Sequence, residues 1–183
     1  MIARIAAALT ALFVLLPLAA SAAELDPQNT LYMDLPAGRV VIQLRPDLAP
    51  NHVARVKELV RDGFYNGTPF HRVIDGFMAQ GGDPTGTGSG GSDLPDLKAE
   101  FTTKAKFTRG MIGAARTSDP DSANSQFFIM FDAAPWLDGQ YTIWGQVVSG
   151  MEFVDALKKG VGQSGAVDNP DRIVKVQVAA DAK

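Results

Sequence analysis

The feature that most restricts the fold of this chain is a series of short apolar runs interrupted by glycine and proline. The 183-residue sequence contains 18 glycines and 11 prolines, and both residue types end helices and strands. Apolar and polar residues alternate within several runs, which is typical of strands with one buried face. The sequence therefore predicts a mainly β fold, a barrel or a sandwich. The expected strands lie near residues 31–35, 40–44, 70–74, 77–80, 111–114, 126–130, 141–148 and 172–179.

Strands are expected at both ends of the domain. The run at residues 31–35 returns through residues 40–44, and the turn between them contains proline and glycine, so a hairpin is predicted. Strands at both ends would let a barrel close without leaving an open edge. The last run sets Ile173, Lys175 and Gln177 on one face and Val174, Val176 and Val178 on the other.

Two segments have the period of helices. The first spans residues 50–62, and Gly63 can end it. The second spans residues 151–159, with Gly160 as its end. The side chains expected to face the core are Val53, Val56 and Val60 in the first helix and Phe153, Ala156 and Leu157 in the second.

The first 23 residues have the design of a secretory signal peptide. One positive charge, Arg4, precedes an uncharged apolar run, and the Ala-Ser-Ala sequence at residues 20–22 has the spacing of a cleavage site. The alternative is an uncleaved membrane anchor, although Pro17 interrupts the run, which is short for a span of roughly 20 residues. We expect one domain over residues 24–183, secreted across the inner membrane into the periplasm.

Charge and cysteine content exclude several classes of protein. The formal net charge is −3 and basic residues do not cluster, whereas nucleic-acid binding depends on neutralising phosphates. Cysteine is absent, so the domain must be stabilised by an ordinary packed core. The sequence has no second long apolar segment. We expect no nucleic-acid partner and no membrane contact after the signal is removed.

The stretch at residues 86–91 matches the G-x-G-x-x-G spacing of dinucleotide-binding loops. That motif needs a following helix whose N-terminal amides hold the phosphates. Residues 92–96 include Pro95 and are poor helix formers. We therefore interpret the stretch as a flexible surface loop and expect no cofactor.

Histidine is too scarce to suggest a metal centre. His52 and His71 are the only two, and no carboxylate lies at a spacing that would complete a site with them. We expect no metal, and we expect His52 to be solvated on the first helix. The two histidines leave a Ser-His-Asp arrangement open, although no motif selects a serine.

Arg72 and Gln80 stand out because they interrupt apolar runs. Five apolar residues that follow Arg72 in the sequence have two interpretations: they are core positions, or they form the walls of a pocket. The residues alone leave both open. These apolar residues are Phe77, Met78, Phe128, Trp136 and Leu137.

Three blocks of the sequence together resemble the cyclophilin-type peptidyl-prolyl cis-trans isomerases. They are FHRVI at residues 70–74 with GFMAQGGD at 76–83, then SQFFI at 125–129, and WLDG at 136–139. The resemblance extends from Thr30 to Val178. It implies a closed eight-stranded antiparallel β-barrel capped by two α-helices.

The resemblance also implies a role for each site residue. Arg72 would be the catalytic arginine, Gln80 would hold its side chain, and Gln126 would hydrogen-bond the substrate. Trp136 would line the pocket edge, at a position associated with cyclosporin-type inhibitors. The pocket for the substrate proline ring would be formed by Phe77, Met78, Phe128 and Leu137.

The chain departs from the family pattern at two site positions. Ala115-Arg116-Thr117 stands where many members have Ala-Asn-Ala, a segment whose main chain pairs with the substrate backbone. Tyr141 stands where many members have a histidine at the pocket rim. The segment 118–123 is also one residue longer than the common form. We expect Ala115, Arg116 and Tyr141 to contact substrate despite these changes.

The implied function is acceleration of rotation about X-Pro bonds in exported proteins that are folding. The partners would be proline-containing polypeptides, and the protein would act as a monomer. The alternative from another class is a proline-peptide-binding chaperone on the same fold that turns over slowly because of Arg116 and Tyr141.

Overall fold

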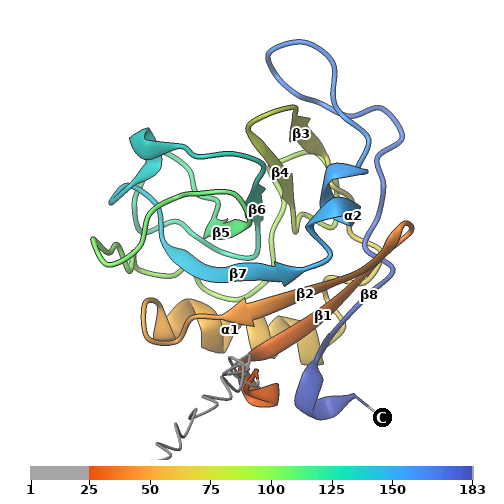
Figure 1. Ribbon diagram of the computed structural model, residues 1–183. Coiled ribbons are helices and arrows are strands. Elements are labelled where there is room, and N and C mark those ends of the chain that lie inside the picture. Colours follow the sequence, from red (N-terminus) through yellow and green to blue (C-terminus); the bar gives the residue numbers. More distant parts are fainter. Residues whose placement is uncertain (1–24, 183) are drawn as a thin grey trace, which may run out of the picture.

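The computed structural model describes residues 25–182 and contains one eight-stranded antiparallel sheet (Figure 1). The mainly β prediction is confirmed, and the strands lie within about three residues of their expected positions. The predicted signal peptide, residues 1–23, lies outside the described residues. The strands are β1 (Thr30–Leu35), β2 (Gly38–Leu44), β3 (Arg72–Ile74), β4 (Met78–Gly81), β5 (Met111–Ala114), β6 (Phe127–Met130), β7 (Ile143–Ser149) and β8 (Lys175–Val178).

The sheet curls but is not a continuous barrel. Its strand order is β3-β4-β6-β5-β7-β2-β1-β8, so β3 and β8 are its edges, and they share no ladder. The segments preceding these edge strands are joined by hydrogen bonds from the Gly67 N–H to the Ile173 carbonyl (2.7 Å) and from the Phe70 N–H to the Asp171 carbonyl (2.9 Å). The sheet is therefore open and curled, and the predicted closed barrel is not confirmed.

The alternation predicted for the last strand fails at its start. Ile173 is buried although it was assigned to the face of Lys175, whereas Val174 is 60% exposed. The reason is that β8 begins only at Lys175, and Ile173 instead hydrogen-bonds the segment before β3. The period of two holds only from Lys175 onward, where Val176 and Val178 are buried.

Helix α1 (Pro50–Arg61) has the inward face that the sequence predicts, with Val53, Val56 and Val60 buried. Gly63 adopts φ +70° and its N–H donates to the Val60 carbonyl, while the Phe64 N–H donates to the Leu59 carbonyl. This pair of bonds is the Schellman ending that glycine favours after a helix.

The other end of α1 is held by a residue distant in sequence. Glu100 accepts hydrogen bonds from the main-chain N–H groups of Asn51 (3.1 Å) and His52 (3.0 Å) and from the His52 ring at Nδ1 (2.6 Å). Its carboxylate supplies the cap that Ala49 lacks. His52 is therefore buried rather than solvated, and burial lowers the pKa of its imidazole.

Helix α2 (Met151–Asp155) is shorter than predicted and lies on a different side of the sheet from α1 (Figure 1). Val154 is its buried residue, and Leu157 is buried just beyond its end. Phe153 is half-buried, as expected, but Ala156 is exposed. Short 3₁₀ turns complete the fold at η1 (Pro27–Asn29), η2 (Pro135–Leu137) and η3 (Ala179–Asp181).

A second apolar cluster lies apart from the main core of the sheet. Partly buried residues of the site predicted from sequence pack against its surface, among them Phe77, Leu137 and Tyr141. The fold therefore offers an apolar surface that is backed by rigid packing. The buried members of the cluster are Leu48, Met78, Phe107, Met111, Phe128, Met130, Ala134 and Ile143.

Candidate active site

Three neighbouring strands bring the central polar residues into one row. In the β3–β4 register Arg72 lies opposite Gln80, and in the β4–β6 register Gln80 lies opposite Phe128. Directly opposed residues of antiparallel strands have side chains on the same face. Strand register alone therefore places a cation, an amide and an aromatic ring side by side.

The guanidinium of Arg72 is held by neutral acceptors on two sides. Its Nη1 donates to Gln80 Oε1 (3.2 Å), and its Nε donates to the main-chain carbonyl of Ser164 (3.0 Å). Gln80 in turn donates from Nε2 to Gln126 Oε1 (2.9 Å), so the three polar side chains form one chain. Within residues 25–182 Arg72 forms no ion pair, and its charge is not cancelled by a carboxylate.

The Ser164 contact was missed by the sequence analysis. Residues 160–167 run beside β3, where the Gly160 N–H donates to the Val73 carbonyl (2.9 Å) and the Val73 N–H donates to the Gly165 carbonyl (2.8 Å). A main-chain acceptor has no side-chain signature, so the available signal was the glycine-rich stretch at residues 160–165. Gly165 adopts φ +69°, which lets the segment turn against β3.

An apolar pocket of about 230 Å³ lies beside Arg72. Met78 and Phe128 are buried in its wall, and the Tyr141 ring packs edge-on against Phe128 with centroids 5.6 Å apart. Every residue that lines it had been assigned to the site from sequence. These residues are Arg72, Phe77, Met78, Gln80, Ala115, Arg116, Phe128, Leu137 and Tyr141.

Two of the predicted site residues do not line the apolar pocket. Trp136 is 66% exposed and lies outside it, with its ring 5.9 Å from the ring of Phe77. Gln126 lines a neighbouring polar pocket instead. Its Nε2 donates to the carbonyls of Gly88 (3.0 Å) and Gly90 (2.8 Å), so a substrate must replace one of these bonds to accept from Nε2.

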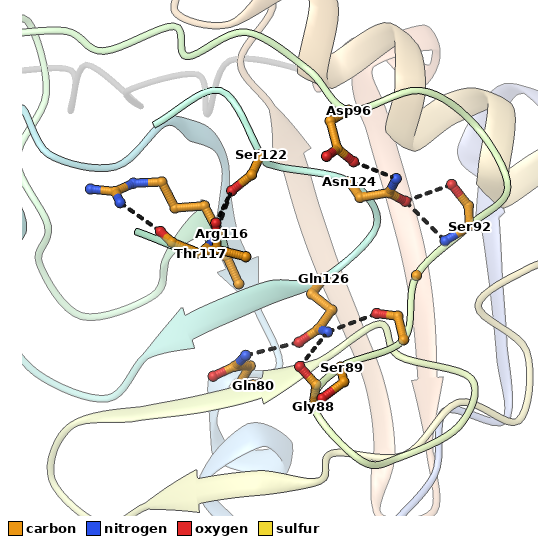
Figure 2. A pocket seen from close by; sticks show the side chains of 13 residues that line it. Gln80, Gly88, Ser89, Ser92, Asp96, Arg116, Thr117, Ser122, Asn124 and Gln126 are labelled. Carbon is orange, nitrogen blue, oxygen red and sulfur yellow. Dashed lines mark hydrogen bonds between the residues drawn. The ribbon is translucent and has the colours of Figure 1, made fainter. Parts of the chain in front are cut away.

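Figure 2 shows the polar pocket, which has a volume of about 470 Å³. It adjoins the apolar pocket. Gln80, Ala115 and Arg116 line both pockets and form a shared wall. The rest of the polar pocket is lined by Gly88, Ser89, Gly90, Gly91, Ser92, Asp96, Thr117, Ser122, Asn124 and Gln126. Together the two pockets form a path with an apolar slot beside a hydrogen-bonding surface.

The glycine-rich loop is a folded wall of the polar pocket. The buried Asp83 carboxylate accepts from the N–H groups of Thr85 (2.8 Å), Gly88 (2.7 Å) and Gly90 (3.1 Å). Burial alone would raise the pKa of Asp83, but hydrogen bonds from Thr85, Gly90 and Gly88 bring it down to about 2. These amides are directed inward to a carboxylate, which agrees with the rejection of a phosphate-binding loop.

Histidine and metal chemistry find no support in the described part of the chain. His71 directly precedes strand β3 in sequence but is buried, and burial lowers the pKa of its imidazole. Among residues 25–182 no three His, Asp or Glu side chains lie close enough together to hold a metal ion. In the same residues no helix has the length and apolar character needed to cross a membrane.

Comparison with known proteins gives the family. The model of the cyclophilin type peptidyl-prolyl cis-trans isomerase family matches residues 30–178. The chain belongs to this family. A Brucella suis protein named "Probable peptidyl-prolyl cis-trans isomerase" is 54% identical, over 94% of this chain and 95% of its own length. The human peptidyl-prolyl cis-trans isomerase-like 1 is 39% identical, over 82% of this chain and 90% of its own length.

Solved cyclophilin structures have the same fold. The cyclophilin AquaCyp293 from Hirschia baltica superposes with a TM-score of 0.76 at 31% identity, covering 87% of this chain and 77% of its own. A Cryptosporidium parvum cyclophilin-type isomerase, crystallised in the presence of the dipeptide Ala-Pro, gives a TM-score of 0.75 at 29% identity. That comparison covers 81% of this chain and 98% of the solved one.

The contact between Arg72 and residues 160–167 leads to a test with a matched pair of glycines. Gly162 and Gly165 both have positive φ, but a Cβ at Gly165 would lie 2.3 Å from Ile74 Cγ1, whereas one at Gly162 meets nothing within 4 Å. Both alanine variants lose about 1–2 kcal/mol to left-handed backbone strain. Only Gly165→Ala must also shift either Ile74 or the 160–167 segment, and a shift of the segment would move the Ser164 carbonyl that accepts from Arg72.

We expect Gly165→Ala to lower kcat/KM for X-Pro isomerisation by roughly 10–100-fold relative to Gly162→Ala, because small misplacements of a catalytic group are costly. The measurement is kcat/KM at a temperature where circular dichroism shows both variants folded. Equal values for the two variants would show that the 160–167 segment does not position Arg72.

Proposed function

We propose that this chain catalyses rotation about X-Pro bonds by placing Arg72 against the proline nitrogen of a peptide bound in the apolar pocket. The observation that carries the proposal is an uncompensated guanidinium, held by Gln80 and Ser164, at the edge of an apolar slot. The family to which the chain belongs supports the same reaction.

The reaction requires little from a catalyst beyond stabilising one geometry. Rotation about a peptide bond costs roughly 18–20 kcal/mol because amide resonance is lost. For X-Pro bonds the cis and trans ends are close in energy, yet uncatalysed exchange takes tens of seconds or longer. Lowering the barrier by about 7 kcal/mol would accelerate exchange on the order of 10⁵-fold.

Arg72 stabilises the twisted amide more than the planar one. When resonance is lost, the proline nitrogen regains a lone pair and becomes a hydrogen-bond acceptor. A guanidinium fixed in advance donates to this nitrogen without reorganising, which is preferential binding of the transition state. The low dielectric of the apolar pocket strengthens the contact. This mechanism uses no nucleophile, general base, metal or cofactor.

The other site residues hold the peptide while the bond rotates. The proline ring occupies the slot formed by Phe77, Met78, Phe128 and Leu137, and Tyr141 closes the rim. The main chain of Ala115 and Arg116, with Gln126, holds the adjoining backbone.

Proline-containing polypeptides are therefore the proposed partners, and the dipeptide Ala-Pro used with the Cryptosporidium parvum cyclophilin supports this substrate class. We expect cyclosporin-type inhibitors to reach Trp136, and we expect a monomer.

A protease-coupled assay tests the catalytic role of Arg72. The coupling protease cleaves only trans peptides, so the slow phase reports cis-to-trans rotation of a short Ala-Pro substrate. We expect Arg72→Ala to lower kcat/KM about 10²–10³-fold, the typical cost of removing one transition-state donor. Arg72→Lys keeps the charge but loses the planar fork, and should recover only part of the rate.

If wild type and Arg72→Ala both give the uncatalysed rate, the proposed catalysis is wrong. Peptide binding that persisted in such a protein would support the alternative, a chaperone that binds proline peptides without turning them over. Unchanged thermal unfolding of Arg72→Ala is the control for a folding defect.

We also propose that the chain acts on exported proteins in the periplasm. The supporting observation is the charge and apolar pattern of residues 1–23. The match with the Brucella suis protein covers 94% of this chain, a larger share of the sequence than residues 25–182 make up. The relative therefore shares part of the N-terminal segment as well as the domain.

Mass spectrometry of the protein recovered from the periplasm of a Gram-negative host tests the export proposal. We expect the mature chain to begin at Ala23 or Glu24, because the small residues before them form the cleavage site. An intact N-terminus found in the membrane fraction would contradict the proposal and support the anchor.

A further inference from the structure

Arg116 occupies a special place between the two pockets. It lies on the shared wall with Gln80 and Ala115, so a peptide that enters both pockets must pass it. Its side chain is half-buried. It also stands where many family members have asparagine, so its effect on substrate choice would not be shared by those members.

The guanidinium of Arg116 is fixed by several contacts. Nε and Nη2 donate to the main-chain carbonyl of Gln140 (3.2 and 2.9 Å), and Nη1 donates to the carbonyl of Thr117 (2.8 Å). The group lies over the Tyr141 ring, 4.4 Å from its centroid, and 6.0 Å from that of Phe101. The two departures from the family pattern, Arg116 and Tyr141, therefore contact each other.

These contacts leave the positive charge of Arg116 uncompensated. Carbonyls and aromatic rings orient a guanidinium but carry no net charge, and within residues 25–182 Arg116 has no ion pair. Arg39, Arg45 and Arg109, by contrast, each pair with an aspartate. Three of the five N–H groups of Arg116 are used, so two remain to donate.

The nearest acidic lining residue lies across the polar pocket. Asp96 hydrogen-bonds Asn124, and Figure 2 shows the Arg116 guanidinium turned away from both. Asp96 would repel a substrate carboxylate that entered the far end of the polar pocket. A substrate carboxylate is therefore favoured at the shared wall and disfavoured further along.

The shared wall is also where the residue before proline belongs. Gln80, which holds Arg72, forms part of this wall, so the rotating bond lies next to it. With the proline ring in the apolar slot, the residue on the other side of that bond passes over Ala115 and Arg116. Its side chain then lies within reach of the free N–H groups of Arg116.

We propose that Arg116 is a specificity-determining residue that favours substrates with glutamate or aspartate directly before the proline. The inference rests on the proposed function, because it takes the apolar slot as the proline site. Arg72 adds positive charge to the same region, so part of the preference persists without Arg116. Exposed ion pairs of this kind change affinity about 2–5-fold.

The test measures peptides that differ only in the residue before proline, which is Glu, Gln or Lys. For wild type we expect kcat/KM for Glu-Pro to exceed that for Gln-Pro about 2–5-fold near 0.1 M salt, with Lys-Pro the slowest. The difference should shrink at 1 M salt, where the Debye length falls from about 10 Å to about 3 Å.

Three variants separate charge from structure. Arg116→Gln should lower the Glu-to-Gln ratio clearly below its wild-type value, with the remainder coming from Arg72, whereas Arg116→Lys should keep most of the wild-type ratio. Arg172→Gln is the matched control, because within residues 25–182 Arg172 also has no ion pair, donates to the Gly67 carbonyl and lies in neither pocket. It changes the net charge equally and should leave the wild-type ratio unchanged.

A wild-type ratio of 1, or a wild-type ratio retained in Arg116→Gln, would overturn the inference. Peptide affinities, measured by calorimetry on the same series, separate this failure from that of the proposed function. Uncatalysed rates combined with an Arg116-dependent affinity for Glu-Pro would overturn the catalysis but support the recognition.

Discussion

The hydrogen bond between Arg72 and Gln80 is the interaction on which the candidate active site depends. It fixes a guanidinium at the edge of an apolar slot by means of a neutral amide, and the Ser164 carbonyl fixes it from a second direction. A carboxylate in either position would hold the arginine as well but would cancel much of its charge. Neutral acceptors orient the group and leave its charge available to a weak acceptor such as a twisted amide nitrogen.

The surrounding fold supplies the rigidity that this arrangement needs. The β3–β4–β6 register sets Arg72, Gln80 and Phe128 in one row, and a buried cluster of apolar side chains supports the slot from behind. On the polar side, the glycine-rich loop is organised by Asp83, whose hydrogen bonds keep the pKa of its carboxyl low and the group charged. The apolar pocket is therefore stabilised by side-chain packing, whereas the loop that lines the polar pocket is stabilised by hydrogen bonds to the charged Asp83 carboxylate.

Local patterns in the sequence predicted the elements that depend on local physics. Helix α1 and its glycine ending follow from residue spacing, and the β1–β2 hairpin follows from alternation around a turn. The apolar pocket was predicted through the family resemblance, because strand register by itself cannot be read from one sequence. Trp136 and Gln126 lie outside this pocket: the Trp136 ring is tilted against that of Phe77, and Gln126 lines the polar pocket.

The features that the sequence did not reveal all depend on contacts between distant segments. His52 is buried because Glu100, 48 residues away, caps its helix, and Val174 is exposed because β8 starts late. The Ser164 carbonyl contacts Arg72 across 92 residues and has no side-chain signature. The edge strands β3 and β8 share no ladder, so the curled sheet is open. The number of strands alone could not predict whether these two edges would pair.

Gln80→Ala tests most directly whether positioning of Arg72 drives catalysis. Exchange NMR on a saturating X-Pro peptide yields the cis–trans rate on the enzyme, and calorimetry yields the peptide affinity. We expect the exchange rate on the enzyme to fall roughly tenfold or more while the affinity changes little, because Gln80 acts through Arg72 in the transition state. An unchanged exchange rate, or a loss of affinity that accounts for the whole effect, would contradict this role of Gln80.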